Sequence, residues 1–287
     1  ATRFFYKLIF QRGNQMGKYR FIAIDVDGTL LDDNDKFDVN RLNKDIELLQ
    51  RQNYHFIIAS GNSYDALSTI FQPCPLVTEF VAENGGRLII NGKSVYGKTH
   101  SIATLQQLYA FIKHTFPSPD ILSLSGETQT ILAEQYRDVP VPFYPHHTYF
   151  SDLQKIIEPI YNLNIGWAKR KLSQTIIQGY VNQLNEQFPN LIQATYSGAY
   201  GIDILPAGVN KALGLKRLVE NYLNGTLDQV VAFGDTSNDI EMLSEVGYGY
   251  AMKNATDDLL KVADKVTRYD NNHTGLLSEI EYQFINR

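Results

Sequence analysis

Residues 19–31 of this chain read Tyr-Arg-Phe-Ile-Ala-Ile-Asp-Val-Asp-Gly-Thr-Leu-Leu. A short apolar run that ends at acidic residues and a glycine is typical of a fully buried strand in a parallel sheet. The strand places Asp25 and Asp27 at its C-terminal end, which is the edge where open parallel sheets bind ligands. Gly28 permits a tight turn there, and an acidic turn or helix cap is the alternative interpretation of the same residues.

The segments that follow alternate between helical and strand-like patterns. Residues 40–53 carry apolar side chains at helical spacing, and residues 55–59 form a second apolar run. A further helical pattern then leads into the run at residues 80–82. This alternation predicts βαβ units and therefore an α/β fold with a Rossmann-like, doubly wound parallel sheet.

The pattern changes after residues 83–86, where short strand-like runs alternate with helical stretches at 104–115 and 152–163. We expect an inserted α+β domain over residues 88–188. Residues 200–205 look like a return to a buried core strand, so the predicted core comprises residues 17–87 and 189–287. We interpret residues 1–16 as an N-terminal extension, either native or added for expression, with Met16 as the natural start.

The composition excludes several classes of protein. The chain has 287 residues, which suggests about two domains, and 44% of them are apolar. Its net charge of −5 argues against a broad nucleic-acid or anionic-membrane surface. No apolar run approaches the roughly 20 residues that span a bilayer. The single cysteine, Cys74, can form no disulfide within the chain and fits a cytoplasmic location.

A second acidic strand end follows the run at residues 230–234. Asp235 comes directly after that run and could join Asp25 at one cation, and Mg²⁺ prefers such oxygen ligands. Asp239 lies four residues further on, where it would support the site from behind without binding the cation directly. Capping of the helix that follows is the alternative role for these acids, and the two roles are compatible.

Two other chain positions complete a possible phosphate site. Ser60 and Gly61 follow the apolar run at residues 55–59 and offer a hydroxyl and an unobstructed backbone amide. Lys211 lies near the start of a predicted helix, where its charge opposes the helix dipole unless an anion sits between them. Each signal is weak alone, but the ordered set at strand and helix ends is much more specific.

These motifs resemble those of haloacid dehalogenase superfamily phosphatases of the Cof type, which carry a large α/β cap. Residues 25–30, Ser60, Lys211 and residues 234–239 match the four family motifs in order, and the tail segments 251–255 and 271–275 are also similar. Many relatives have Thr-Gly-Arg at the second motif, whereas this chain has Ser60-Gly61-Asn62, so the contact of that arginine cannot be assumed. The segments 59–64 and 81–85 are most similar to a sugar-phosphatase group.

The resemblance implies a role for each matching residue. Asp25 is the nucleophile that forms an aspartyl-phosphate, and Asp27 is the general acid and base. Mg²⁺ is held by Asp25, by the main-chain carbonyl of Asp27 and by Asp235. By the same resemblance, Ser60, Gly61, Lys211 and Asn238 bind the phosphoryl oxygens.

We therefore expect a Mg²⁺-dependent phosphatase of small phosphorylated metabolites, in particular sugar phosphates, whose cap selects the leaving group. No nucleic-acid, membrane or obligate protein partner is implied. A phosphosugar mutase is the first alternative, although nothing in the sequence suggests a second phosphate clamp. A phosphate-dependent binding or signalling module is the second, since such α/β domains also phosphorylate an aspartate near other acids and a lysine.

Overall fold

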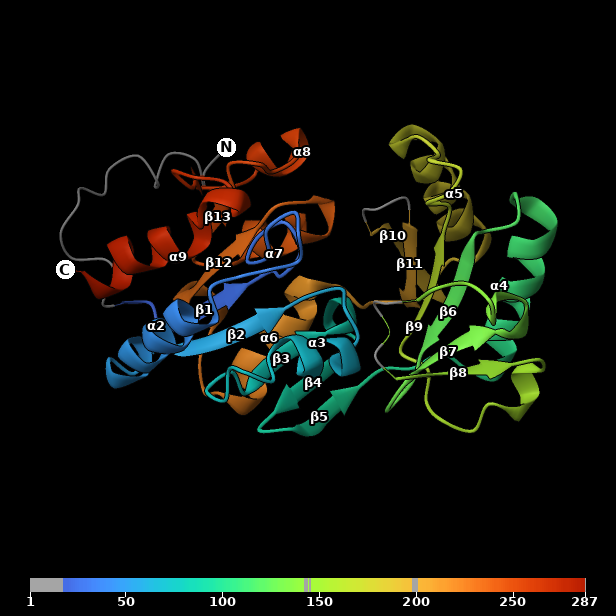
Figure 1. Cartoon of the computed structure of the whole chain (residues 1–287), viewed down its shortest axis with the longest axis horizontal. Helices are drawn as coiled ribbons and strands as arrows, with labels where there is room; N and C mark the ends of the chain where they lie inside the picture. Colours follow the sequence, from blue (N-terminus) through green and yellow to red (C-terminus); the bar gives the residue numbers. More distant parts are fainter. Residues whose placement is uncertain (1–17, 142–143, 145, 198–200, 287) are drawn as a thin grey trace.

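The computed structural model describes residues 18–141, 144, 146–197 and 201–286. It contains two β-sheets, which lie in separate bodies on the left and right of Figure 1. The predicted extension at residues 1–16 lies outside the described residues.

The first sheet forms the core body. Its strands are β1 (Phe21–Ile24), β2 (His55–Ala59), β3 (Glu79–Ala82), β4 (Arg87–Ile90), β5 (Lys93–Gly97), β12 (Val230–Gly234), β13 (Tyr248–Ala251) and β14 (Lys265–Val266). They are arranged in the order β14-β13-β12-β1-β2-β3-β4-β5. Neighbours from β14 to β3 are parallel, and β4 and β5 add an antiparallel edge.

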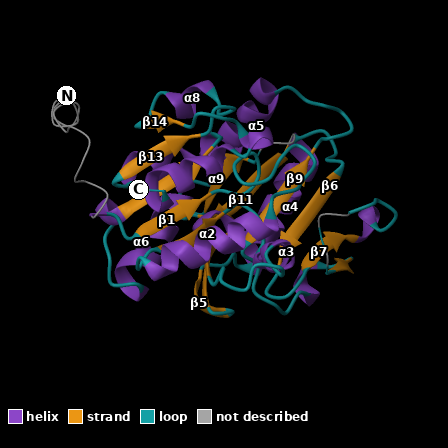
Figure 2. Ribbon diagram, turned by 60° about the vertical axis from the view of Figure 1, so that its left-hand side comes forward, coloured by secondary structure: helices purple, strands orange, loops and turns teal. Residues whose placement is uncertain are grey.

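Helices cover both faces of the core sheet. They are α2 (Val39–Arg51), α3 (Tyr64–Ile70), α6 (Lys211–Tyr222), α7 (Ile240–Glu245), α8 (Asp257–Leu260) and α9 (Gly275–Ile280). Ile22 and Ile24 of β1 pack with α2, α3 and α9, whereas Phe21 and Ala23 pack with α6, α7 and α8. Figure 2 shows α2 lying along the strands. The alternation confirms the predicted doubly wound α/β core.

Short helical turns complete the core, and they are η3 (Glu83–Gly85), η6 (Leu227–Gln229), η7 (Ser237–Asp239), η8 (Asn271–His273) and η9 (Glu281–Ile285).

Local side chains cap the N-termini of two core helices, α2 and α6. Oδ1 of Asp38 accepts a hydrogen bond from the backbone N–H of Arg41 at 3.0 Å, and Oδ1 of Asn210 accepts one from Leu213 at 2.8 Å. Such caps satisfy backbone donors that have no partner within the helix. Asn210 thereby fixes Lys211 as the first residue of α6.

The second sheet forms the cap. Its strands are β6 (Ile121–Ser125), β7 (Thr130–Ala133), β8 (His147–Phe150), β9 (Asn162–Gly166), β10 (Ile192–Tyr196) and β11 (Gly201–Pro206). Their order is β10-β11-β9-β6-β7-β8, antiparallel except between β7 and β8. The cap also contains α4 (Ile102–Thr115), α5 (Gln174–Gln187), η4 (Glu134–Tyr136) and η5 (Leu153–Lys155).

The helices α4 and α5 cover one face of the cap sheet. Alternate strand residues point toward them and form one apolar cluster with the helices, and these residues include Leu122, Leu124, Leu163, Ile165, Ile202 and Ile204. Trp167 is fully buried in the same cluster and donates its indole N–H to the carbonyl oxygen of Pro117 at 2.9 Å. The opposite face of the sheet is therefore free to face the core body.

Both predicted cap boundaries were wrong. β4 and β5 lie after residue 86 but pair with the core sheet, because an Asn91-Gly92 turn folds them into a hairpin. β11 was predicted to be a core strand, yet it pairs with β9 and β10. The second sheet and its helices consequently lie between residues 102 and 206. An apolar run indicates a buried strand but not the sheet to which that strand belongs.

The prediction of a helix over residues 152–163 was also wrong, because the elements in this stretch are the short turn η5 and the start of β9.

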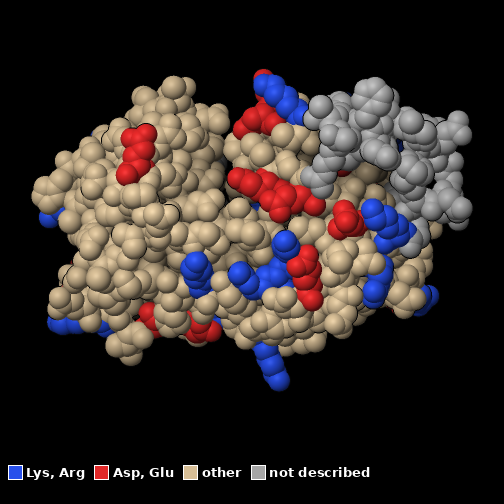
Figure 3. Space-filling view, turned by 180° about the vertical axis from the view of Figure 1, so that it is seen from behind, with Lys and Arg blue, Asp and Glu red and all other residues tan. Residues whose placement is uncertain are grey.

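Among the residues that the structure describes, no helix combines the length and apolar character needed to cross a bilayer. Figure 3 shows Lys and Arg side chains interspersed with Asp and Glu side chains over one face of the core body.

Candidate active site

Three neighbouring parallel strands bring predicted site residues to one edge of the core sheet. Asp25 follows β1, Asp235 follows β12 and Ser60 follows β2. β1 pairs with both β12 and β2, so the carboxyl ends of the three strands lie side by side. The predicted grouping at this edge is therefore present.

Lys211 lies between two of the acids. Its ammonium Nζ is 2.8 Å from Oδ1 of Asp25 and 2.7 Å from Oδ1 of Asp239. All three side chains are buried, so these ion pairs are poorly screened by water. Lys211 was predicted to bind phosphate, and the structure shows that it also holds the predicted nucleophile.

The acidic cluster carries strongly shifted pKa values. Burial, followed by the charges of Asp25 and Asp239, raises the pKa of Asp235 to about 9. Burial and the charge of Asp25 raise the pKa of Asp239 to about 6. Burial alone would lower the pKa of Lys211, but the two carboxylates raise it above its ordinary value. The three carboxylates therefore repel one another more than a single ammonium can offset.

These residues fit a hard divalent cation. Carboxylate oxygens of Asp25, Asp235 and Asp239 lie within 4.8 Å of one another. Oδ1 of Asp235 is buried without a hydrogen-bond donor beside it, which leaves this oxygen available to a cation. Asp239 differs, since its Oδ2 accepts backbone N–H bonds from Asp235 at 3.0 Å and from Thr236 at 3.3 Å. Both of its oxygens are thus engaged, in keeping with a supporting position.

Asp27 points away from this cluster toward the second motif. Its Oδ2 accepts a hydrogen bond of 2.7 Å from Nδ2 of Asn62. Burial raises the pKa of Asp27 above its ordinary value, and the bond from Asn62 partly opposes that effect. The neutral Asn62, at the position of the arginine in many relatives, thus contacts the predicted acid and base directly.

The predicted phosphate-binding residues lie next to these groups. Ser60 is fully buried, and its Oγ accepts the backbone N–H of Asn62 at 3.1 Å. A side chain at Gly61 would contact Asn84, whose Nδ2 lies 3.1 Å from the position of the missing Cβ. Nδ2 of Asn238 donates to Oδ1 of Asn84 at 3.1 Å. The structure therefore brings Ser60, Gly61 and Asn238 together, while their binding of phosphate stays a prediction.

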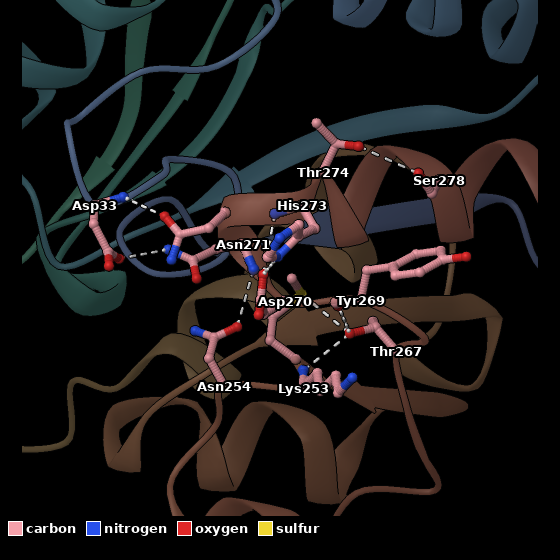
Figure 4. Close-up of polar contacts among 12 residues, drawn as sticks. Asp33, Lys253, Asn254, Thr267, Tyr269, Asp270, Asn271, His273, Thr274 and Ser278 are labelled. Atoms are coloured by element: carbon pink, nitrogen blue, oxygen red, sulfur yellow. Dashed lines mark hydrogen bonds and ion pairs between the residues drawn. The ribbon is translucent and has the colours of Figure 1, made fainter.

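The tail segments fix the turn that follows the first acids. Nδ2 of Asn254 donates to the carbonyl oxygen of Gly28 at 2.8 Å, and Oδ1 of Asn254 accepts the backbone N–H of Asn271 at 3.1 Å. Nδ2 of Asn271 reaches the carbonyl oxygen of Leu31 at 3.0 Å and Oδ1 of Asp33 at 3.2 Å. Figure 4 shows Asn254, Asn271 and Asp33 in this network. These asparagines hold the backbone on which Asp25 and Asp27 depend.

A cavity of about 490 Å³ extends from the acids to the cap. Asp25 and Asp27 line its core end. Ser123 of β6, Asn164 of β9 and Asp203 of β11 lie in adjacent register at its cap end. The cap lining further includes Ser125, Thr130, Tyr144 and Asn162. The face of the cap sheet opposite its helices thus presents hydroxyl, amide and carboxyl groups to the reacting end.

Sequence reasoning assigned no role to several of these residues. Glu83 and Asn84 follow β3 and could have been found by the same strand-end rule that identified Asp25. Asp203 stands inside the apolar run of β11, and an acid in a buried strand is a signal in its own right. Burial above all raises the pKa of Asp203, while bonds from Asn162, Asn164 and Asn84 lower it.

Comparison with known proteins agrees with this geometry. The sequence profile of the haloacid dehalogenase-like hydrolases matches residues 22–280. The chain belongs to that family. The resemblance seen in the motifs, including the Cof type, is thereby confirmed. The family match covers both the core and the cap.

Individual relatives are similar over nearly their whole length. The chain is 29% identical over 268 residues to the 5-amino-6-(5-phospho-D-ribitylamino)uracil phosphatase YbjI of Escherichia coli, covering 91% of this chain and 95% of the relative. It is 26% identical to the phosphatase YitU of Bacillus subtilis, named for the same substrate, covering 86% and 91%. The crystal structure of SMU.1108c from Streptococcus mutans has a TM-score of 0.82 at 28% identity, covering 92% and 98%.

Proposed function

We propose that this hydrolase is a Mg²⁺-dependent phosphatase of small metabolites whose leaving group is polyhydroxylated, as in sugar phosphates. The cavity of about 490 Å³ carries this proposal, because it joins the acids Asp25 and Asp27 to the hydroxyl and amide face of the cap sheet. Phosphatase activity is the family-level part of the proposal, in keeping with the names of both relatives. The polyhydroxylated character of the leaving group is the more specific part of the proposal, and it rests on the lining of the cavity.

The core end can carry out both halves of a phosphatase reaction. Asp25, held by Lys211, would attack phosphorus and form an aspartyl-phosphate. Asp27 would protonate the departing alcohol and then take a proton from the attacking water. Burial raises the pKa of Asp27 and so favours the protonated form that the first step requires.

Phosphate binding is assigned to the groups around these acids. Ser60, Gly61, Lys211 and Asn238 are proposed to bind the phosphoryl oxygens. When bound, Mg²⁺ would be held by Asp25, Asp235 and the main-chain carbonyl of Asp27, and it would offset the negative charge of the phosphoryl group. Asp239 would support the site through Lys211 and the backbone of Asp235.

The cap end suits a neutral leaving group better than a second phosphate. Of the described residues that line the cavity, Lys169 is the sole lysine or arginine. Hydroxyls of a sugar or polyol pair well with amides and hydroxyls such as those of Asn164 and Ser123. A mutase must hold two phosphates in turn, so this lining supports hydrolysis over the mutase alternative.

A second candidate substrate is a phosphorylated polyol chain that carries a planar ring. Beside its polar groups, the cavity is lined by Ile121, Val139 and Ala168, which offer an apolar surface for such a ring. The substrate for which YbjI and YitU are named combines a phosphorylated ribityl chain with a uracil ring.

A cytoplasmic location is part of the same proposal, because Cys74 can form no disulfide within the chain.

A panel of phosphorylated metabolites tests these proposals. Purified protein is assayed for phosphate release with sugar phosphates, polyol phosphates, the ribitylamino-uracil phosphate and p-nitrophenyl phosphate, each with Mg²⁺ and with a chelator. We expect Mg²⁺-dependent release, fastest with polyhydroxylated leaving groups. Isomerised sugar without released phosphate would favour the mutase, and phosphate binding without turnover would favour a binding module. A preference for the ribitylamino-uracil compound over plain polyol phosphates would favour the second candidate.

A further inference from the structure

The turn η3 links the phosphate side of the core to the cap. Glu83, Asn84 and Gly85 all have positive φ, at 52°, 49° and 95°. This conformation is unfavourable for most residues other than glycine, although asparagine adopts it more readily than most. η3 follows β3, which pairs with β2, so the turn lies beside Ser60 and Gly61.

The side chain of Asn84 joins the two bodies. Nδ2 of Asn238 donates to Oδ1 of Asn84 at 3.1 Å, and Nδ2 of Asn84 donates to Oδ2 of Asp203 at 2.9 Å. Oδ1 of Asp203 accepts from Asn162 at 2.9 Å and from Asn164 at 2.8 Å. Asn84 and Asp203 are 2% and 5% exposed, so water can replace none of these bonds cheaply.

The direction of this chain of bonds follows from the chemistry of its ends. Asp203 accepts hydrogen bonds from three amide groups, so the amino end of the Asn84 amide faces it. Its carbonyl end then faces Asn238 and can only accept. The side-chain amide of Asn84 therefore links the two residues, so that the orientation of Asn238 depends on the position of Asp203 in the cap.

We propose that Asn84 is a positioning residue that couples seating of the cap to phosphate binding by Asn238. This inference rests on the proposed function, which makes Asn238 a phosphate ligand. A displacement of Asp203 would take the acceptor away from Nδ2 of Asn84, and Asn84 would then no longer fix Asn238. Phosphate is therefore held most tightly when the cap is seated. Gly61 fits this arrangement, since a Cβ there would lie 3.3 Å from Oδ2 of Asp203.

Asn84→Gly tests the side chain apart from the backbone. Glycine adopts positive φ freely, so this variant removes the amide without straining the turn. Asn91→Gly is the matched control, because Asn91 also has a positive φ, of 50°, but is exposed in the turn between β4 and β5. Asp203→Ala removes the acceptor from the cap side, and Asp203→Asn keeps the size of the side chain but replaces one of its two acceptor oxygens with a donor.

The measurement is the affinity of the Mg²⁺-loaded protein for inorganic phosphate, by calorimetry, with thermal unfolding alongside. We expect Asn84→Gly and Asp203→Ala each to weaken phosphate binding about 10-fold, and the double variant to lose no more than either single one. Asp203→Asn should also weaken phosphate binding, and Asn91→Gly should bind phosphate as the wild type does. A merely structural role would instead lower the unfolding temperature and leave phosphate affinity unchanged.

Three results would overturn the inference: unchanged phosphate affinity in Asn84→Gly, losses that multiply in the double variant, or no phosphate binding by the wild type. The proposed function is judged separately by turnover. If the wild type hydrolyses no phosphate ester, but the double variant loses no more phosphate affinity than either single variant, the coupling stands and the proposed function fails. If the wild type hydrolyses phosphate esters, but the losses of phosphate affinity in the two single variants multiply in the double variant, the proposed function stands and the coupling fails.

Discussion

Replacing Gly28 with alanine should displace Asp235 from the proposed cation site. Gly28 has a φ of +70°, and a Cβ built there would lie 2.3 Å from Oδ2 and 2.8 Å from Cγ of Asp235. Carbon and oxygen atoms that are not bonded do not approach so closely, so either the turn or Asp235 must move. The turn is held by the bond from Asn254 to the carbonyl oxygen of Gly28. Asp235 is therefore the group expected to shift.

Two effects of the substitution can be estimated separately. The left-handed backbone costs alanine about 1–2 kcal/mol relative to glycine, which lowers stability without affecting the site. Relief of the collision moves Oδ2 of Asp235 by roughly 1 Å, and a misplacement of that size in an active site can reduce the rate by about 10²-fold. We therefore expect kcat/KM to fall about 100-fold and the Mg²⁺ concentration for half-maximal activity to rise.

Gly92→Ala is the matched control for this experiment. Gly92 has a φ of +74°, but its nearest neighbour to an added Cβ is Oη of Tyr64 at 3.9 Å. The two variants share the backbone strain and differ in the collision. Activity is titrated against Mg²⁺ in both, and binding of Mg²⁺ is measured by calorimetry. If Gly28→Ala needs no more Mg²⁺ than Gly92→Ala and turns over equally fast, Asp235 is not a ligand held by this turn.

Three further predictions concern other parts of the site. Asp27→Asn should slow hydrolysis of sugar phosphates about 10²–10⁴-fold, and it should slow that of p-nitrophenyl phosphate less, because a good leaving group needs little protonation. Equal losses of rate for the two substrates would argue against the acid role, provided that hydrolysis of the aspartyl-phosphate is shown not to limit the rate. Burial raises the pKa of Glu83 from 4.5 to about 8, so the folded protein holds a proton that the unfolded chain releases, and stability should fall as pH rises from about 4.5 to 8. Glu83→Gln should flatten that fall in thermal unfolding, and an unchanged pH profile would contradict it. Ser123→Ala in the cap should lower kcat/KM about 10-fold for sugar phosphates but leave p-nitrophenyl phosphate unaffected, because Ser123 lines the cavity and contacts Tyr144 rather than Asp203; a parallel loss for both substrates would show that Ser123 does not select the leaving group.

The core of the site could be predicted because its signals are local. Asp25, Ser60 and Asp235 each follow a short apolar run, and parallel topology alone brings the ends of neighbouring strands together. The helix start at Lys211 is also marked locally, by the cap residue Asn210. No knowledge of distant contacts was needed for these residues.

The link between the core and the cap could not be predicted in the same way. Asn84 and Asp203 are 119 positions apart, and their bond depends on how the two bodies are placed. Neighbouring strands bring Asn62 close to Asp27, but the sequence does not show that the amide of Asn62 bonds to the carboxyl of Asp27. The sequence shows such polar residues but not their partners.

The cap boundaries failed for a related reason. β11 is an apolar run followed by a helix, and this pattern is the same whether the strand joins the core sheet or the cap sheet. Pairing with β9 and β10 decides the question, and pairing is a long-range property. The hairpin of β4 and β5 was missed because its change of pattern was interpreted as the start of a new domain.

The stereochemical course at phosphorus tests the central claim most directly. If the phosphoryl group passes through Asp25, it undergoes two in-line displacements, and each inverts the configuration at phosphorus. A phosphorothioate ester made chiral at phosphorus with two oxygen isotopes, hydrolysed in water that carries the third oxygen isotope, should therefore yield inorganic thiophosphate with net retention of configuration. Net inversion would show that water attacks the substrate directly, and it would contradict the assignment of Asp25 as the nucleophile.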